Sequence, residues 1–164
     1  MSTKKEIVTI ANYQKLAMRT CLPSAKNWEY ATRNYKAELF ELLAKVASFH
    51  AKQIRDGDDF DKAKYSDKIK DELGDCYWQL ALICELRNEQ FKSNYEEKVD
   101  WNSYDMVMQM NFESFINDVW IEFGRIDFIV RMFDFDINEI LQRNIAKLSS
   151  RKARGVLKGN GDDR

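Results

Sequence analysis

Residues that interrupt helices are scarce in this sequence. Its 164 residues contain one proline, Pro23, and six glycines, three of which (Gly155, Gly159 and Gly161) lie in the last ten residues. Tight turns between short strands rely on proline and glycine. Their scarcity therefore argues against a fold of many strands and favours long helices.

Long apolar runs and clustered metal-binding cysteines or histidines are lacking as well. No run reaches the roughly 18 apolar residues of a membrane span, and residues 1–20 contain no apolar signal-peptide core. Cys21, Cys76 and Cys84 lack the spacing of a zinc site, and His50 is the single histidine. We therefore expect a cytoplasmic protein (in the host cytoplasm if a virus encodes it) with buried free thiols and no membrane binding.

The composition is typical of one globular domain. Apolar residues make up 45% and charged residues 32% of the chain, and its length suffices for a real core. The formal net charge of −1 argues against dedicated nucleic-acid binding.

Hydrophobic periodicity predicts an all-α bundle of about five helices and no strand. Gly57 supplies an end for the second helix, Ser66 a cap for the third, and Asp136 with Glu139 resembles a capping box for the last. The expected helices are 5–20, 28–54, 67–88, a long one ending near Phe133, and one from Asp136 to about Ser150. The long helix carries an apolar stripe of Met108, Phe112, Phe115, Ile116, Val119, Phe123, Ile126 and Val130. We expect one domain over residues 1–150 and a basic, glycine-containing tail over 151–164.

Two expected helices carry a pair of carboxylates beside an apolar face. In the third helix the pair is Glu72 and Asp75, on a stripe that continues to Gln79. After Asp75 this helix is apolar on nearly every side, so we expect other helices to surround it. The second helix repeats the arrangement with Glu38 and Glu41. Antiparallel packing of the two apolar faces would bring both pairs to one seam.

Two interpretations of these pairs are open. Either pair alone is common on solvated helix faces, and Glu41 with Lys45 has the spacing of an ordinary ion pair. Four converging carboxylates, however, repel one another unless they are protonated or neutralised by cations. Mg²⁺ prefers oxygen ligands and commonly bridges carboxylates to phosphates. The pattern therefore fits either solvated surface charges or a metal site.

Basic residues gather near the C-terminus. Residues 147–158 include five basic side chains and no acidic one. Arg151 and Arg154 follow Asn144 and Lys147 at helical spacing, and the planar guanidinium binds phosphate oxygens in pairs. The segment is also consistent with a solvated arm or a small nucleic-acid patch.

Together these residues resemble the MazG-like nucleotide pyrophosphohydrolases, within the all-α NTP pyrophosphatase superfamily that includes dimeric dUTPases. The superfamily signature, E-x-x-E followed by E-x-x-D, reads ELFE (Glu38, Glu41) and ELGD (Glu72, Asp75). The surrounding ELLAKVA, KQIRDG and KDELGDCYWQLA match too, and YQKLAMRT and the C-terminal segment look like those of small phage-type or bacterial members. Only 89–134 is hard to recognise. Ala37 and Phe40 replace small residues that many members carry at the first motif, which leaves substrate specificity open.

The resemblance implies hydrolysis of a nucleoside triphosphate between its α- and β-phosphates, which gives a monophosphate and pyrophosphate. It implies Mg²⁺, with Mn²⁺ as a substitute, on Glu38, Glu41, Glu72 and Asp75, and a glutamate (Glu38 or Glu41) that activates water. By the same resemblance the phosphates would contact Lys45, Asn144, Lys147, Arg151 and Arg154, with the C-terminal tail completing the active site. Family members form homodimers or homotetramers, for which the long fourth helix is a suitable interface.

Other functions are compatible with these residues. One is hydrolysis of a different pyrophosphate compound, such as dUTP or an alarmone. Another is a helical nucleotide-binding or assembly module without turnover, which the altered surroundings of ELFE motivate. Four aromatic residues could stack on a base but also suit a core or an interface: Trp28, Phe40, Trp78 and Trp101.

Overall fold

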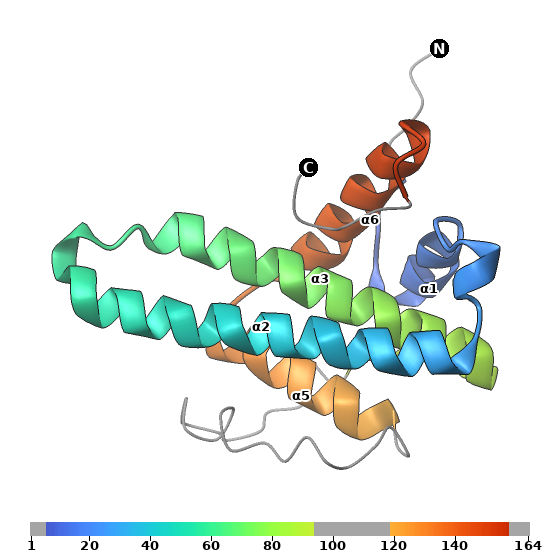
Figure 1. Cartoon of the computed structure of the whole chain (residues 1–164), viewed down its shortest axis with the longest axis horizontal. Coiled ribbons are helices and arrows are strands. Elements are labelled where there is room, and N and C mark those ends of the chain that lie inside the picture. The colour runs from blue at the N-terminus through green and yellow to red at the C-terminus, as the bar shows by residue number, and fades with distance from the viewer. Residues whose placement is uncertain (1–5, 94–118, 158–164) are drawn as a thin grey trace.

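The computed structural model describes residues 6–93 and 119–157 (Figure 1). These residues contain no strand, and their helices are α1 (Ile10–Met18), α2 (Trp28–Asp56), α3 (Lys62–Arg87), α5 (Val119–Met132) and α6 (Ile137–Ala153). Two short 3₁₀ turns, η1 (Pro23–Ala25) and η2 (Gly57–Asp59), precede and follow α2. The all-α prediction is confirmed for this part of the chain.

Helices α2 and α3 form a long antiparallel hairpin that spans the molecule (Figure 1). The side chain of Asn27 caps α2 by accepting a hydrogen bond from the Tyr30 amide at 2.8 Å. Gly57 ends α2 as predicted, with a positive φ of 54° that other residues adopt at a cost. Asp61 caps α3 by accepting from the Lys64 amide at 3.0 Å.

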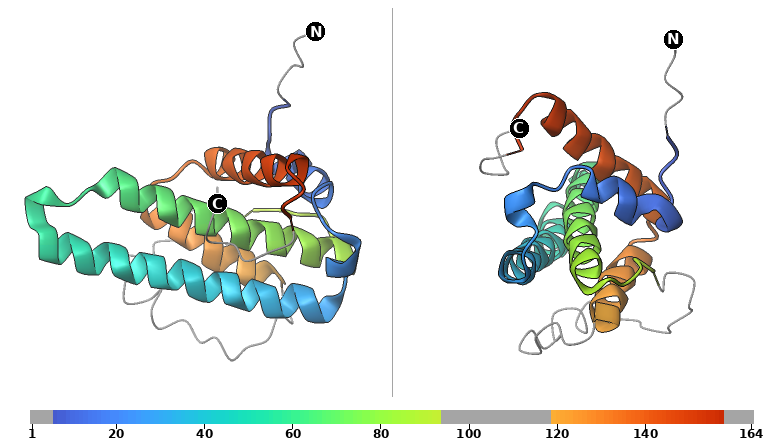
Figure 2. Two further views of the ribbon diagram at one scale, coloured as in Figure 1. Left: turned by 45° about the horizontal axis from the view of Figure 1, so that its top comes forward. Right: turned by 90° about the vertical axis from the view of Figure 1, so that its right-hand side faces the viewer.

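Helix α3 is the centre of the bundle. It contacts α1, α2, α5 and α6, and Figure 2 shows these helices arranged around it. Every residue from Cys76 to Cys84 is buried. The prediction that other helices surround this segment is confirmed, and the packed run gives Glu72 and Asp75 a rigid base.

Helices α1 and α6 lie on one side of α3 and α5 lies on the other (Figures 1 and 2). Two buried tyrosines fix α5 to the hairpin through its carboxylates. The Tyr35 hydroxyl donates to Glu122 at 2.8 Å, and the Tyr77 hydroxyl donates to Asp127. Since a buried carboxylate is costly without such partners, these contacts specify how α5 docks.

Several predicted helix ends were wrong. Helix α3 begins at Lys62 rather than Asp67, because Asp61 and not Ser66 supplies the cap. Helix α1 begins at Ile10 rather than near residue 5, because Thr9 is extended and forms a capping box with Asn12. Helix α6 continues past Ser150 to Ala153.

The last two helices agree in part with the predicted pattern. Asp136 caps α6 by accepting from the Asn138 amide, but the Glu139 carboxylate bonds Lys70 instead of completing a capping box. Helix α5 covers the end of the predicted fourth helix, and its stripe residues Val119, Phe123, Ile126 and Val130 are buried. The earlier stripe residues, Met108, Phe112, Phe115 and Ile116, lie outside the described residues.

The three cysteines are free; Cys76 and Cys84 are buried as predicted, and Cys21 is partly exposed. Within the two described stretches, no helix combines the length and the apolar character needed to cross a bilayer.

Candidate functional site

Three of the four predicted carboxylates converge at the seam between α2 and α3. Glu38 from α2 meets Glu72 and Asp75 from α3, and one carboxylate oxygen of each lies within 4.8 Å of the others. Glu41 lies outside this group. Its side chain is exposed and lines a pocket, described below, that Glu38 and Asp75 also line. We call Glu38, Glu72 and Asp75 the carboxylate cluster.

Burial and crowding disfavour ionisation of the cluster. Burial first, and then the charges of Asp75, Glu41 and Glu72, raise the pKa of Glu38 to about 7. The pKa of Glu72 and that of Asp75 are also raised, mainly by burial. The neighbouring cations Lys45 and Lys147 only partly offset this effect. The cluster is therefore short of positive charge.

Asp75 is held by two side chains of α6. The ammonium of Lys147 lies 2.7 and 2.6 Å from its two carboxylate oxygens, and the Asn144 amide donates to it at 3.0 Å. The fully buried Tyr13 of α1 donates its hydroxyl to the Asn144 oxygen at 2.9 Å. A chain of hydrogen bonds thus runs from α1 through α6 to Asp75.

Close approach of α6 to α3 depends on Gly74, the third residue of ELGD. A Cβ atom at this position would lie 2.9 Å from the Asn144 Cβ, closer than real side chains approach. The glycine therefore permits the packing that places Asn144 and Lys147 on Asp75.

The other two cluster members have partners on α2. Asn34 donates to a Glu38 oxygen at 3.1 Å, one turn away on the same helix. The Lys45 ammonium lies 3.6 Å from a Glu72 oxygen. Lys45 therefore crosses the seam to the cluster.

A pocket of about 420 Å³ opens beside the cluster, a size within the usual range of about 300–1,000 Å³ for small-molecule sites. Glu38, Glu41 and Asp75 line it together with the guanidinium-bearing Arg151. Its other lining residues are mostly apolar or aromatic: Thr20, Leu22, Ala25, Tyr30, Asn34, Ala37, Trp78, Gln79, Leu148 and Leu157.

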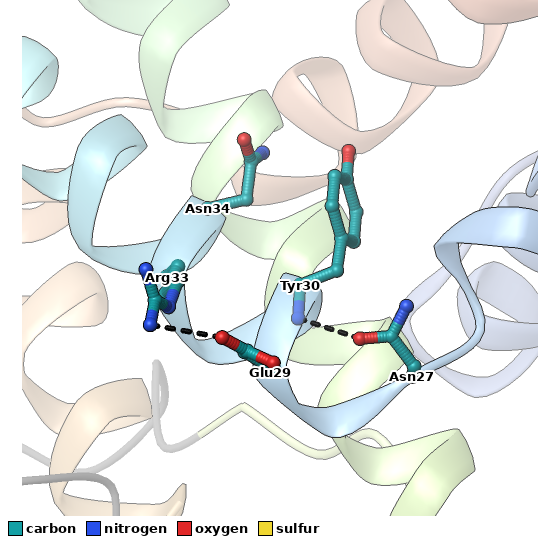
Figure 3. A pocket seen from close by; sticks show the side chains of 5 residues that line it. All are labelled: Asn27, Glu29, Tyr30, Arg33 and Asn34. Carbon is teal, nitrogen blue, oxygen red and sulfur yellow. Dashed lines mark hydrogen bonds and ion pairs between the residues drawn. The ribbon is translucent and has the colours of Figure 1, made fainter.

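A neighbouring hollow of about 400 Å³ is lined by Asn27, Glu29, Tyr30, Arg33 and Asn34. Figure 3 shows Tyr30 and Asn34 on one side of α2 and the ion pair of Glu29 and Arg33 on another. Since Tyr30 and Asn34 line both hollows, this second one adjoins the pocket at the cluster.

The predicted phosphate contacts divide into two groups. Asn144 and Lys147 already contact Asp75. Arg151 lines the pocket, and its positive charge partly offsets the rise in the pKa of Asp75. Arg154 is exposed, and its Nε donates to the Ser150 carbonyl oxygen at 3.4 Å. The structure does not bring Arg154 to the pocket.

The four aromatic residues that could stack on a base lie in different environments. Trp78 lines the pocket, with its indole nitrogen bonded to Thr20 and the Ala17 carbonyl. Trp28 and Phe40 are exposed, 46% and 56%. Trp101 lies outside the described residues.

The donor set of the cluster suits a hard divalent cation. Its three ligands are all carboxylate oxygens, the type that Mg²⁺ and Mn²⁺ prefer. Burial and the neighbouring carboxylates raise the pKa values of all three groups, and a bound cation would favour their ionised forms.

No family model, curated protein or solved structure matches this chain. A functional assignment therefore depends on the residues and their geometry.

Proposed function

We infer that this protein is a Mg²⁺-dependent nucleoside triphosphate pyrophosphohydrolase of the MazG-like type. It would convert a (deoxy)nucleoside triphosphate and water into a monophosphate and pyrophosphate. One observation carries this proposal: Glu38, Glu72 and Asp75 converge from two helices, and Glu38 and Asp75 line a pocket that Arg151 also lines. The resemblance of ELFE and ELGD to the superfamily signature supports it.

In this proposal the cluster holds the cation, with Mn²⁺ as a substitute for Mg²⁺. A bound ion would supply Lewis-acid stabilisation of the negative charge that develops on the phosphate oxygens. Glu41 stands exposed at the same pocket, where it can complete the ligand set or orient water.

Glu38 is suited to handling a proton. General bases work best when their pKa lies near the operating pH; in the metal-free protein the pKa of Glu38 is about 7, and a bound cation would lower it. Its Oε1 is already oriented by Asn34. Glu38, or Glu41 one turn away, would accept the proton of the attacking water.

The basic side chains around the pocket would meet the polyphosphate. Arg151 lines the pocket directly, and Lys45 and Lys147 border the cluster. Because Asn144 is buried between Tyr13 and Asp75, it would position the Asp75 carboxylate rather than touch substrate. The tail beyond residue 157 lies outside the described residues.

Product identification tests the proposal. The purified protein is incubated with Mg²⁺ and a panel of nucleoside triphosphates, including dUTP, and an alarmone, and the products are separated by anion exchange. We expect monophosphate and pyrophosphate from nucleoside triphosphates. Activity confined to dUTP or the alarmone would show that this compound, and not nucleoside triphosphates in general, is the substrate. Binding without turnover would favour the non-catalytic module.

Two variants and a control assign the activity to the cluster. Glu72→Gln and Asp75→Asn should each lower kcat/KM by about 100-fold or more, since metal-derived charge stabilisation amounts to several kcal/mol. Glu85→Gln changes an exposed carboxylate on the same helix and should leave the rate unchanged. Undiminished activity in Asp75→Asn would contradict the proposed site.

A further inference from the structure

The pocket contains a buried hydrogen-bond acceptor that the carboxylate cluster does not use. Gln79 is 4% exposed, and its side-chain oxygen Oε1 accepts no hydrogen bond from the described residues. Gln79 also lines the pocket. More than nine in ten buried polar groups in proteins have a partner, and leaving one unsatisfied is costly. Because Gln79 lines the pocket, a ligand that packs against it can supply the missing donor.

The location of Gln79 relates it to the cluster. It follows Asp75 by one helical turn of α3, about 6 Å along the helix axis. A ligand whose phosphates lie at the cluster would therefore extend its other end toward Gln79. Aromatic surface from Tyr30 and Trp78 lines the same pocket, and aromatic side chains are the common partners of flat bases.

The amide group of Gln79 is divided between two partners. A side-chain hydrogen bond from Gln79 lowers the pKa of Tyr30, against the burial that raises it. The carbonyl oxygen Oε1 has no donor among the described residues, so a ligand in the pocket that presents an N–H group would satisfy it.

We propose that Gln79 Oε1 reads the nucleobase by accepting a hydrogen bond from the exocyclic amino group of cytosine or adenine. The inference rests on the proposed function and deepens it by naming the substrate class. Uracil, thymine, hypoxanthine and guanine carry an oxo oxygen at the equivalent ring position. Placed in the same way, that oxygen would face another acceptor and leave both without a donor. Each of these bases also has a ring N–H that can donate to a carbonyl oxygen, and guanine has a 2-amino group, so the matched pairs below decide whether Gln79 reads the amino edge.

Binding of monophosphates in EDTA tests the proposal without metal or turnover. Isothermal titration compares matched pairs that differ by amino against oxo: dCMP with dUMP, and AMP with IMP. The wild-type protein should bind the amino member of at least one pair about tenfold or more tightly, because the oxo member leaves the buried acceptor unpaired. The two pairs also separate a pyrimidine pocket from a purine pocket.

Gln79→Met removes the acceptor at nearly constant side-chain volume. The preference within each pair should fall to about twofold or less. Gln53→Met, at an exposed position on α2, should keep the wild-type preference. Circular dichroism establishes that both variants fold, and the wild-type comparison needs no variant.

Equal affinities within both pairs for the wild-type protein would overturn the proposal, as would a preference that survives in Gln79→Met. These outcomes are distinct from a failure of the proposed function. A protein that selects amino bases but hydrolyses no triphosphate contradicts the function alone. One that hydrolyses triphosphates with no selection between paired bases contradicts the base-reading role alone.

Discussion

The carboxyl group of Glu38 has a pKa of about 7 because burial and three neighbouring carboxylates disfavour its charged form. In the unfolded chain its pKa is near the ordinary 4.5. Between these values the folded state binds more protons, so the free energy of unfolding decreases as pH rises from about 4.5 to 7. For metal-free protein this contribution is at most about 3 kcal/mol.

Urea denaturation in EDTA at pH 5 and pH 8 measures this dependence. Glu38→Gln should reduce the change in unfolding free energy between the two pH values, because one of the titrating carboxyl groups is gone. Glu29→Gln removes an exposed carboxylate paired with Arg33 and should behave as wild type. An unchanged pH dependence in Glu38→Gln would refute the raised pKa.

Tyr13 acts on the cluster through a single hydroxyl. Tyr13→Phe deletes the hydrogen bond to Asn144 and frees the amide that donates to Asp75. Partners of metal ligands typically contribute about 10–100-fold to metal affinity, so we expect the Mg²⁺ concentration for half-maximal activity to rise about tenfold. Tyr65→Phe, near the start of α3, serves as the hydroxyl-deletion control. A shift of the same size in both variants would exclude a positioning role for Tyr13.

At the scale of helices, the separation of α3 and α6 is set by Gly74. In Gly74→Ala the new Cβ would lie 2.9 Å from the Asn144 Cβ, so α6 must move outward. We expect a loss of about 1–3 kcal/mol in unfolding free energy, the usual effect of overpacking, and weaker metal binding. Chemical denaturation and metal titration measure the two effects.

Gly124→Ala is the matched control on α5. Its Cβ would meet nothing within 4 Å, and alanine favours the helix by about 0.5–1 kcal/mol. This variant should be equal to or more stable than wild type. Equal unfolding free energies of Gly74→Ala and Gly124→Ala would contradict the proposal that the close approach of α6 requires a glycine at position 74.

Periodicity and breaker residues predicted the helices well where apolar residues recur. The helix ends were harder to predict. Asp61 and Ser66 can both cap a helix, and the polar residues between them contain no apolar pattern that would indicate which one does. Local sequence also contains nothing that links Tyr13 to Asn144, since the two residues come from opposite ends of the chain. Such contacts depend on tertiary packing.

For the molecule as a whole, large apolar side chains remain exposed on two helices. Trp28, Phe40 and Ile54 lie on α2, and Trp120 and Ile121 lie on α5. Together with the family resemblance, they lead us to expect a homodimer or homotetramer. Light scattering coupled to size exclusion measures the mass in solution, and a monomer at all concentrations would contradict this expectation.

The candidate site was predictable from sequence to the extent that helix geometry defines it. The repeated i, i+3 acidic pairs placed Glu38, Glu72 and Asp75 on one seam, because an antiparallel hairpin leaves few alternatives. The separate position of Glu41 and the exposure of Arg154 depend on helix rotation and on the course of α6. Spacing alone does not determine either.

Direct metal binding tests whether two helices build a divalent-cation site from Glu38, Glu72 and Asp75. Mn²⁺ binding is followed by electron paramagnetic resonance, with Mg²⁺ as competitor, in wild type, Glu72→Gln, Asp75→Asn and the control Glu29→Gln. We expect Mn²⁺ binding that Mg²⁺ displaces, weakened about tenfold or more in each cluster variant and unchanged in the control. Equal Mn²⁺ affinity in all four proteins would contradict it.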